Sequence, residues 1–135
     1  MMPWMIAFLM MATPSPVLTV PVAHAEERVW TVEEVRELAI EVAEQYGLHK
    51  GRFLATLECE NHFNAKGQSN HYLKGVREDS WGAAQINLPY HSDVTRKQAE
   101  DPVFALNWMA MAWLDGNAKW WTCYRTLVSG TPPNK

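Results

Sequence analysis

The sequence contains no uninterrupted run of about 20 apolar residues, the length that an α-helix needs to cross a membrane. The first 25 residues carry no Asp, Glu, Lys or Arg, and their two apolar stretches, 4–12 and 17–22, are separated by the Thr-Pro-Ser-Pro segment 13–16. Ala-His-Ala at 23–25 has the small-x-small form of a signal-peptidase site. We therefore predict a signal peptide over 1–25, with an uncleaved anchor as the alternative, and an exported protein that is periplasmic, cell-wall-associated or extracellular.

Basic residues are also scarce, because 12 Lys and Arg stand against 15 Asp and Glu. They form no stripe of the kind that binds nucleic acid, so we exclude a nucleic-acid partner. Gly-rich phosphate loops and nucleophile-elbow motifs are absent. His62, His71, His91 and Cys59 do not have the spacing of zinc ligands. We predict no metal and no cofactor.

There are only two cysteines, Cys59 and Cys123. In an exported protein this even number favours a disulfide, with two buried free thiols as the alternative. The bridge would tie the helix that carries Glu60 to the last helix. Closing a loop of about 65 residues stabilises the folded chain by about 4 kcal/mol in the chain-entropy model.

Apolar residues make up 47% of the 135 residues, and seven are tryptophans, which is enough for the core of one domain. We predict a single domain over 26–130, a tail over 131–135, and a monomer. Among the indoles, Trp108, Trp113 and Trp120 are assigned to the core. Trp81 and Trp121 are expected near a cleft.

Apolar periodicity and capping residues predict several helices. Thr31 and Glu34 form a capping-box pattern at the start of a helix over 31–46. Asp101 and Pro102 are a strong N-cap and first-turn pair, and the helix they begin is apolar on nearly all sides and is therefore expected to be the core helix. The predicted elements are helices over 31–46, 49–61, 93–99, 101–114 and 117–128, a loop or short hairpin over 64–80, and a short helical turn over 81–87. The predicted fold is mainly α, as one domain, with at most one small hairpin.

Glu60 falls in the last turn of the predicted helix 49–61. A carboxylate there is disfavoured by the helix dipole, and flanking aromatic residues remove water from it. Both effects raise the pKa of the carboxyl, as a general acid requires. Glu58 lies at a similar angle to the apolar stripe, and we read it as a surface carboxylate or a neighbour of Glu60.

Two motifs give this acid a context. Residues 60–64, Glu-Asn-His-Phe-Asn, are similar to the Glu-Ser-x-Phe-Asn signature of the soluble lytic transglycosylases, which have a lysozyme-like fold. Residues 82–86, Gly-Ala-Ala-Gln-Ile, match that family's Gly-Leu-Met-Gln-Ile motif in its Gly, Gln and Ile. The resemblance covers about 30–124. The family's third motif, Ala-Tyr-Asn, is not evident, and Tyr124 stands where it is expected.

The resemblance implies an enzyme that cleaves the glycan strands of peptidoglycan. Glu60 would protonate the bond between N-acetylmuramic acid and N-acetylglucosamine and then act as a base, leaving a 1,6-anhydro end. The side chains expected to bind the sugars by hydrogen bonds or stacking are Gln85, Asn61, Asn87, Trp81, Tyr72, Tyr90 and Tyr124.

Two rival functions stay open. Glu78 or Asp79 would act as a second carboxylate in a muramidase that adds water instead. The other rival is a glycan-binding protein of the same fold without turnover.

Overall fold

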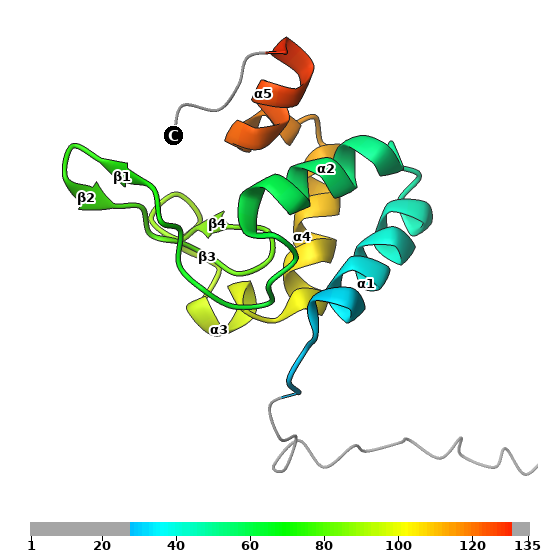
Figure 1. The fold of residues 1–135 in the computed structure, drawn as a ribbon, viewed down its shortest axis with the longest axis horizontal. Coiled ribbons are helices and arrows are strands. Elements are labelled where there is room, and N and C mark those ends of the chain that lie inside the picture. The colour runs from blue at the N-terminus through cyan, green and yellow to red at the C-terminus, as the bar shows by residue number, and fades with distance from the viewer. Residues whose placement is uncertain (1–27, 131–135) are drawn as a thin grey trace, which may run out of the picture.

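Helices and two short hairpins make up the part of the protein that the computed structural model describes, residues 28–130 (Figure 1). The predicted signal peptide, 1–25, and the tail, 131–135, lie outside these residues. The mainly helical fold is confirmed, but the expectation of at most one hairpin is wrong. Within residues 28–130, no helix has both the length and the apolar character needed to span a membrane.

The first two helices begin and end where local chemistry predicts. Helix α1 (Val32–Gln45) starts with the Thr31 capping box, in which the Thr31 hydroxyl accepts from Glu34 N–H and the Glu34 carboxylate accepts from Thr31 N–H. Helix α2 (Lys50–Asn61) begins with His49, whose ring accepts from the N–H of Arg52. It ends at His62 in the left-handed conformation. The end of α2 therefore falls directly after Glu60.

Helix α4 (Pro102–Leu114) is capped by Asp101, as predicted. It packs against α1, but it is not buried on all sides, since Val103, Met111 and Leu114 are exposed. The expectation that this helix is buried on all sides is therefore wrong. The short helix α3 (Arg96–Ala99) precedes it and covers only the end of the predicted 93–99 helix, because its capping residue is Thr95.

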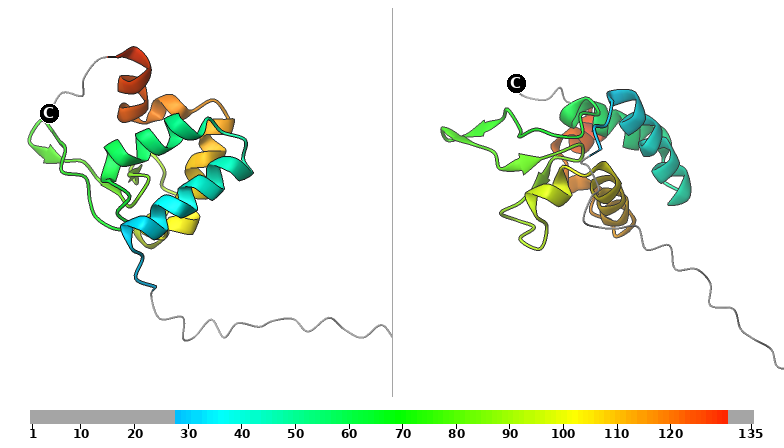
Figure 2. Two further views of the ribbon diagram at one scale, coloured as in Figure 1. Left: turned by 45° about the vertical axis from the view of Figure 1, so that its right-hand side comes forward. Right: turned by 90° about the horizontal axis from the view of Figure 1, so that it is seen from below.

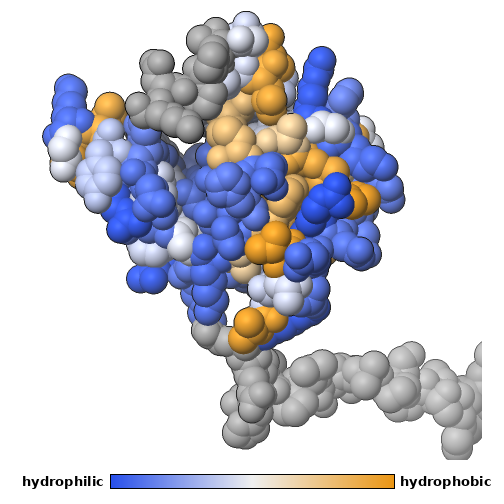
Figure 3. All heavy atoms as spheres, viewed as in Figure 1, coloured by the Kyte–Doolittle hydropathy of each residue, from blue (hydrophilic) through white to orange (hydrophobic). Residues whose placement is uncertain are grey.

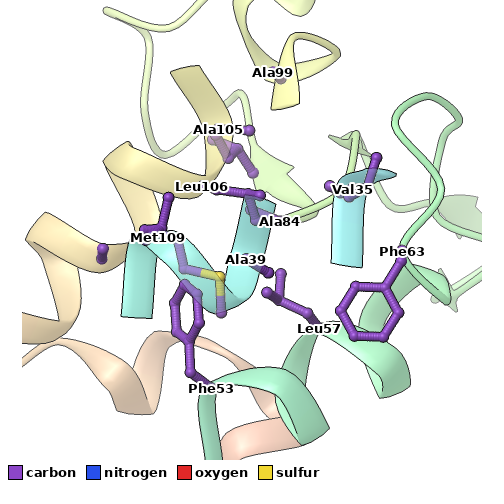
Figure 4. Close-up of a cluster of buried hydrophobic side chains, with 14 of the residues drawn as sticks. Val35, Ala39, Phe53, Leu57, Phe63, Ala84, Ala99, Ala105, Leu106 and Met109 are labelled. Atoms are coloured by element: carbon purple, nitrogen blue, oxygen red, sulfur yellow. The ribbon is translucent and has the colours of Figure 1, made fainter. Parts of the chain in front are cut away.

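The core lies between α1, α2 and α4. Phe53 and Leu57 of α2 point toward Ala39 of α1 and Met109 of α4, and all four side chains are fully buried (Figure 4). Burying a Phe or Leu side chain contributes about 1.5–3 kcal/mol. This packing fixes the direction of α2 and hence the place of the carboxylate at its end.

Two antiparallel hairpins follow α2. Strands β1 (Tyr72–Leu73) and β2 (Val76–Arg77) project from the helices in the ribbon views (Figures 1 and 2). Leu73 and Val76 of this hairpin are exposed, and Figure 3 shows hydrophobic atoms at its end among hydrophilic ones. Strands β3 (Ser80–Trp81) and β4 (Ile86–Asn87) form the second hairpin. The predicted helical turn over 81–87 is therefore wrong. Gly82 and Gln85 have φ of 79° and 47°, which a right-handed helix does not allow.

The predicted last helix, 117–128, is divided in two. A 3₁₀ turn, η2 (Ala118–Trp120), is followed by α5 (Thr122–Ser129), and the two are separated by Trp121 in an extended conformation. The indole N–H of Trp121 donates to the carbonyl of Ala84 at 2.6 Å. This bond holds the Trp121 side chain inward and interrupts the helix.

Candidate active site

Glu60 lies where the end of α2 meets the start of α5. Its Oε1 accepts a hydrogen bond from the backbone N–H of Cys123 at 3.2 Å. Helix α5 has Trp121 at its N-cap, and no side chain of its own caps it. The Glu60 carboxyl therefore supplies a capping acceptor from a different helix.

The pKa of Glu60 is raised to about 7, mainly by burial and to a smaller extent by the negative charge of Glu78. The hydrogen bond from Cys123 and the positive charge of Arg125 act in the opposite direction and lower it. The predicted rise is confirmed, with burial as its main cause. A carboxyl with this pKa is partly protonated near neutral pH and can both give and accept a proton.

The disulfide predicted between Cys59 and Cys123 is present, with an S–S distance of 2.07 Å and Cα atoms 6.0 Å apart. Cys59 directly precedes Glu60, and Cys123 provides the N–H that Glu60 accepts. The bridge therefore fixes both sides of that hydrogen bond. It joins α2 to α5, the two helices that meet at the acid.

Glu60 lines a cavity of about 490 Å³. The other lining residues come from the stretch 78–91, from α4, and from the stretch 119–125. The cavity therefore joins segments that are far apart in the sequence. A volume of this size is typical of a small-molecule or sugar site.

Of the two proposed second carboxylates, only Glu78 lines this cavity. Its Oε1 accepts from the hydroxyl of Ser80 at 2.6 Å, and its Oε2 lies 3.3 Å from Nδ1 of His71. The carboxylate of Asp79 instead accepts from the indole N–H of Trp81. Glu78 is thus the carboxylate that shares the cleft with Glu60.

Aromatic rings form one wall of the cavity. His91 packs against Trp108 and Trp120, with ring centroids 4.7 and 5.0 Å apart, and Trp121 lies 6.0 Å from Trp108. Trp121 was expected here and is 5% exposed. Trp120 was expected in the core, which is wrong, since it is 49% exposed and lines the cleft. Trp108 packs on the core and also lines the cleft, whereas Trp113 lies between Phe53 and Tyr124.

The turn between β3 and β4 is built around Gly82. A Cβ at this position would lie 1.8 Å from the carbonyl oxygen of Ala99, so only glycine fits. The carbonyl of Gly82 accepts from Nε2 of Gln85 at 2.8 Å and from Nδ2 of Asn61 at 3.0 Å. Asn61 therefore ties the 60–64 motif to the 82–86 motif.

These bonds change how the two amides are understood. Gln85 lines the cavity, but its side-chain nitrogen donates to the carbonyls of Gly67 and Gly82, so only its oxygen is left for a ligand. Asn61 lies outside the cavity lining, and its nitrogen donates to backbone carbonyls. Both amides hold the turn between β3 and β4 through the carbonyl of Gly82.

The remaining predicted binding residues divide into two groups. Asn87 and Tyr90 line the cavity. Tyr72, Trp81 and Tyr124 do not, and the structure corrects their expected position in the cleft. Tyr72 is exposed on the projecting hairpin, and Tyr124 packs on Trp113. The Trp81 ring is covered by the guanidinium of Arg96, 3.9 Å from its centroid.

Sequence reasoning missed several lining residues, which are His91, Lys119, Trp120, Thr122 and Arg125. Four of them fall within seven residues of the chain, in the segment for which the sequence predicts one continuous helix. The run of Trp, Lys and Arg beside Cys123 was the available signal, because the disulfide brings this segment to Glu60.

Among residues 28–130, no group of three or more His, Cys, Asp or Glu side chains is placed to hold a metal ion. The chain matches no protein-family model, no curated protein and no solved structure.

Proposed function

We propose that the protein is an exported lytic transglycosylase of lysozyme-like fold, which cleaves the glycan strands of peptidoglycan with Glu60 as its acid and base. The observation that carries this proposal is the Glu60 carboxyl, whose pKa is raised to about 7 by burial and which lines a cavity walled by aromatic rings. The resemblance of residues 60–64 and 82–86 to the motifs of that family supports it. The Cys59–Cys123 disulfide agrees with an oxidising location outside the cytoplasm.

In the proposed reaction, protonated Glu60 donates its proton to the glycosidic oxygen between N-acetylmuramic acid and N-acetylglucosamine. The bond from the muramyl C1 to this oxygen breaks, with assistance from the muramyl acetamido oxygen. The Glu60 carboxylate then removes the proton from the muramyl C6 hydroxyl. The C6 oxygen bonds to C1 and closes the 1,6-anhydro ring, so Glu60 finishes in its starting protonation state.

The aromatic rings and the polar side chains that line the cavity indicate how sugars would bind. Trp120 is exposed enough to stack on a sugar face, and the side-chain oxygen of Gln85 is available to accept from a hydroxyl or amide group. Asn87 Oδ1 accepts from the N–H of Tyr90 at 3.3 Å, so the Asn87 side-chain nitrogen is the group that would donate to a sugar oxygen. A sugar bound against these rings would also exclude water from the Glu60 carboxyl.

The decisive experiment compares Glu60→Gln with Glu58→Gln on purified sacculi. Glu58 is a matched control, because it is a carboxylate in the same helical turn that lies outside the cavity and faces His62. We expect Glu60→Gln to lose more than a hundredfold in rate, within the range for general acid–base catalysis. We expect Glu58→Gln to retain activity. Lysis by Glu60→Gln at the wild-type rate would overturn the assignment, and tight binding without any cleavage by the wild type would identify a glycan-binding protein.

A second candidate function is hydrolysis by a muramidase, which the position of Glu78 in the cleft favours. Hydrolysis needs a second carboxylate to activate water or to stabilise charge, whereas anhydro-ring closure needs one. Mass spectrometry of the released muropeptides separates the two reactions, since anhydro ends are lighter by one water. If Glu78→Gln abolishes cleavage and the wild-type products are not anhydro, the muramidase is correct.

A further inference from the structure

A pair of cations lines the cleft beside the aromatic wall. Lys119 and Arg125 both line the cavity that contains Glu60. They come from η2 and α5, on either side of Trp121. The proposed proton transfers use neither of them.

The two residues are fixed relative to each other. Nη1 of Arg125 donates to the backbone carbonyl of Lys119 at 2.6 Å, and Nη2 donates to the hydroxyl of Thr122 at 3.1 Å. These two bonds hold the guanidinium in one orientation. A guanidinium has five N–H donors, so three stay available to a ligand.

Their charges are not neutralised by the protein. Across the described range 28–130, no carboxylate makes an ion pair with Lys119 or Arg125. Several other cations do have such partners, for example Arg96 with Glu100 at 3.0 Å. The positive charge of Arg125 lowers the pKa of Glu60, but the hydrogen bond that Glu60 Oε1 accepts comes from the N–H of Cys123. The positive charge of the pair is therefore free to meet an incoming anion.

From this placement we infer that Lys119 and Arg125 form a carboxylate-recognition site, which makes the cleft prefer glycan strands bearing carboxylates over neutral ones. The inference rests on the proposed function for the identity of the strand. Hydroxyl and acetamido groups of a neutral strand need only neutral partners, whereas a guanidinium and an ammonium together match a carboxylate. In peptidoglycan the carboxylate comes from the muramyl lactyl group or, where that group carries a peptide, from the peptide.

The test measures binding in the full chain carrying Glu60→Gln, so that ligands are not consumed. Titration calorimetry uses three oligosaccharides of equal length: a neutral N-acetylglucosamine oligomer, a peptide-free muramyl strand with its lactyl carboxylate, and a peptide-bearing strand. We expect at least one anionic strand to bind tenfold or more tightly than the neutral oligomer, and added salt to reduce this preference. Which anionic strand binds more tightly identifies the source of the carboxylate.

Lys119→Gln and Arg125→Gln, each added to Glu60→Gln, should remove most of the preference and leave binding of the neutral oligomer unchanged. Arg125→Lys, which keeps the charge, should retain part of it, and this separates loss of charge from loss of folding. Lys97→Gln is the matched control, because Lys97 is exposed on α3 outside the cavity. Equal binding of neutral and anionic strands, no binding of any strand, or an unchanged preference in both variants would overturn the inference. A chain that shows the preference but cleaves nothing as wild type would refute the proposed reaction and leave the recognition site standing.

Discussion

The backbone N–H of Cys123 donates to the carboxyl of Glu60 at 3.2 Å, and the disulfide partner of Cys123 is Cys59, the residue directly before that acid. A single arrangement thus caps a helix, anchors the acid and links two helices covalently. The pKa of Glu60 can therefore be tested in two ways, by varying the pH and by removing the disulfide.

Replacing Glu60 by Gln should stabilise the protein above pH 7 and leave its stability unchanged near pH 4. The pKa of this carboxyl is about 7 when folded, against an ordinary value of 4.5. Between these values the folded chain holds a proton that the unfolded chain has lost, so wild-type stability falls as pH rises. The gain at pH 8 should be on the order of 3 kcal/mol, measured by denaturant unfolding at both pH values.

The control for this measurement is Glu58→Gln, which removes an exposed carboxylate from the same turn. It should change stability little at either pH. If Glu60→Gln has the same effect at pH 4 as at pH 8, the acid is not held neutral by burial.

Replacing both cysteines by alanine should lower the free energy of unfolding by about 4 kcal/mol. Without the bridge, the unfolded chain regains the conformational entropy that closing a loop across a sequence separation of 64 had removed. The hydrogen bond from the Cys123 N–H lowers the pKa of Glu60, so weakening this bond should raise that pKa. The upper limb of the pH–activity profile should then move to higher pH. Chemical denaturation and a pH profile of cell-wall lysis measure the two effects. Addition of reductant to the wild type should reproduce both, and a profile that stays in place would show that the bridge does not position this bond.

Gly82→Ala should cost far more stability than Gly75→Ala. Both glycines have nearly the same positive φ, 79° and 78°. A Cβ at Gly82 would clash with the carbonyl of Ala99, whereas a Cβ at Gly75 meets nothing within 4 Å. The pair therefore separates backbone strain from the clash, which should add about 1–3 kcal/mol or more. Equal shifts in Tm for the two variants would contradict the close approach of the turn to α3.

Trp120→Ala should weaken binding of glycan strands about tenfold, which corresponds to about 1.4 kcal/mol. Trp120 lines the cleft with half of its surface exposed. Tyr72→Ala is the matched comparison, since Tyr72 is an exposed aromatic residue outside the cavity and should have no effect. Calorimetric titration in the Glu60→Gln background measures both. The opposite ranking would favour the position expected from sequence for Tyr72.

Features governed by near neighbours in the chain could be predicted from the sequence. The capping box of Thr31 and Glu34 and the Asp101 cap depend on residues within one helical turn. The disulfide and the raised pKa of Glu60 followed from residue type and position. These predictions did not require knowledge of distant packing.

Features governed by tertiary contacts could not be predicted. The helical turn predicted over 81–87 is wrong because the close approach of Gly82 to the carbonyl of Ala99, which is distant in the sequence, sets the conformation of the 82–85 turn. The break in the last helix at Trp121 likewise depends on the distant carbonyl of Ala84. A continuous helix over 117–128 would place Trp120 on the apolar face, which is why the sequence predicts it in the core. Lys119 and Arg125 could not be identified as cleft residues from the sequence, because only the folded chain brings them into the same cavity as Glu60.

The cleft is assembled from α2, the 78–91 stretch, α4 and the 119–125 stretch, and this has a consequence for comparing shorter chains. A homologous fragment ending before Lys119 would keep both sequence motifs and the acid itself. It would nevertheless lack the Trp120 and Trp121 rings, the paired cations, and the amide that holds the carboxyl in place. Such a truncated chain would contain both motifs yet have no complete groove, because the two motifs span less of the chain than the groove does.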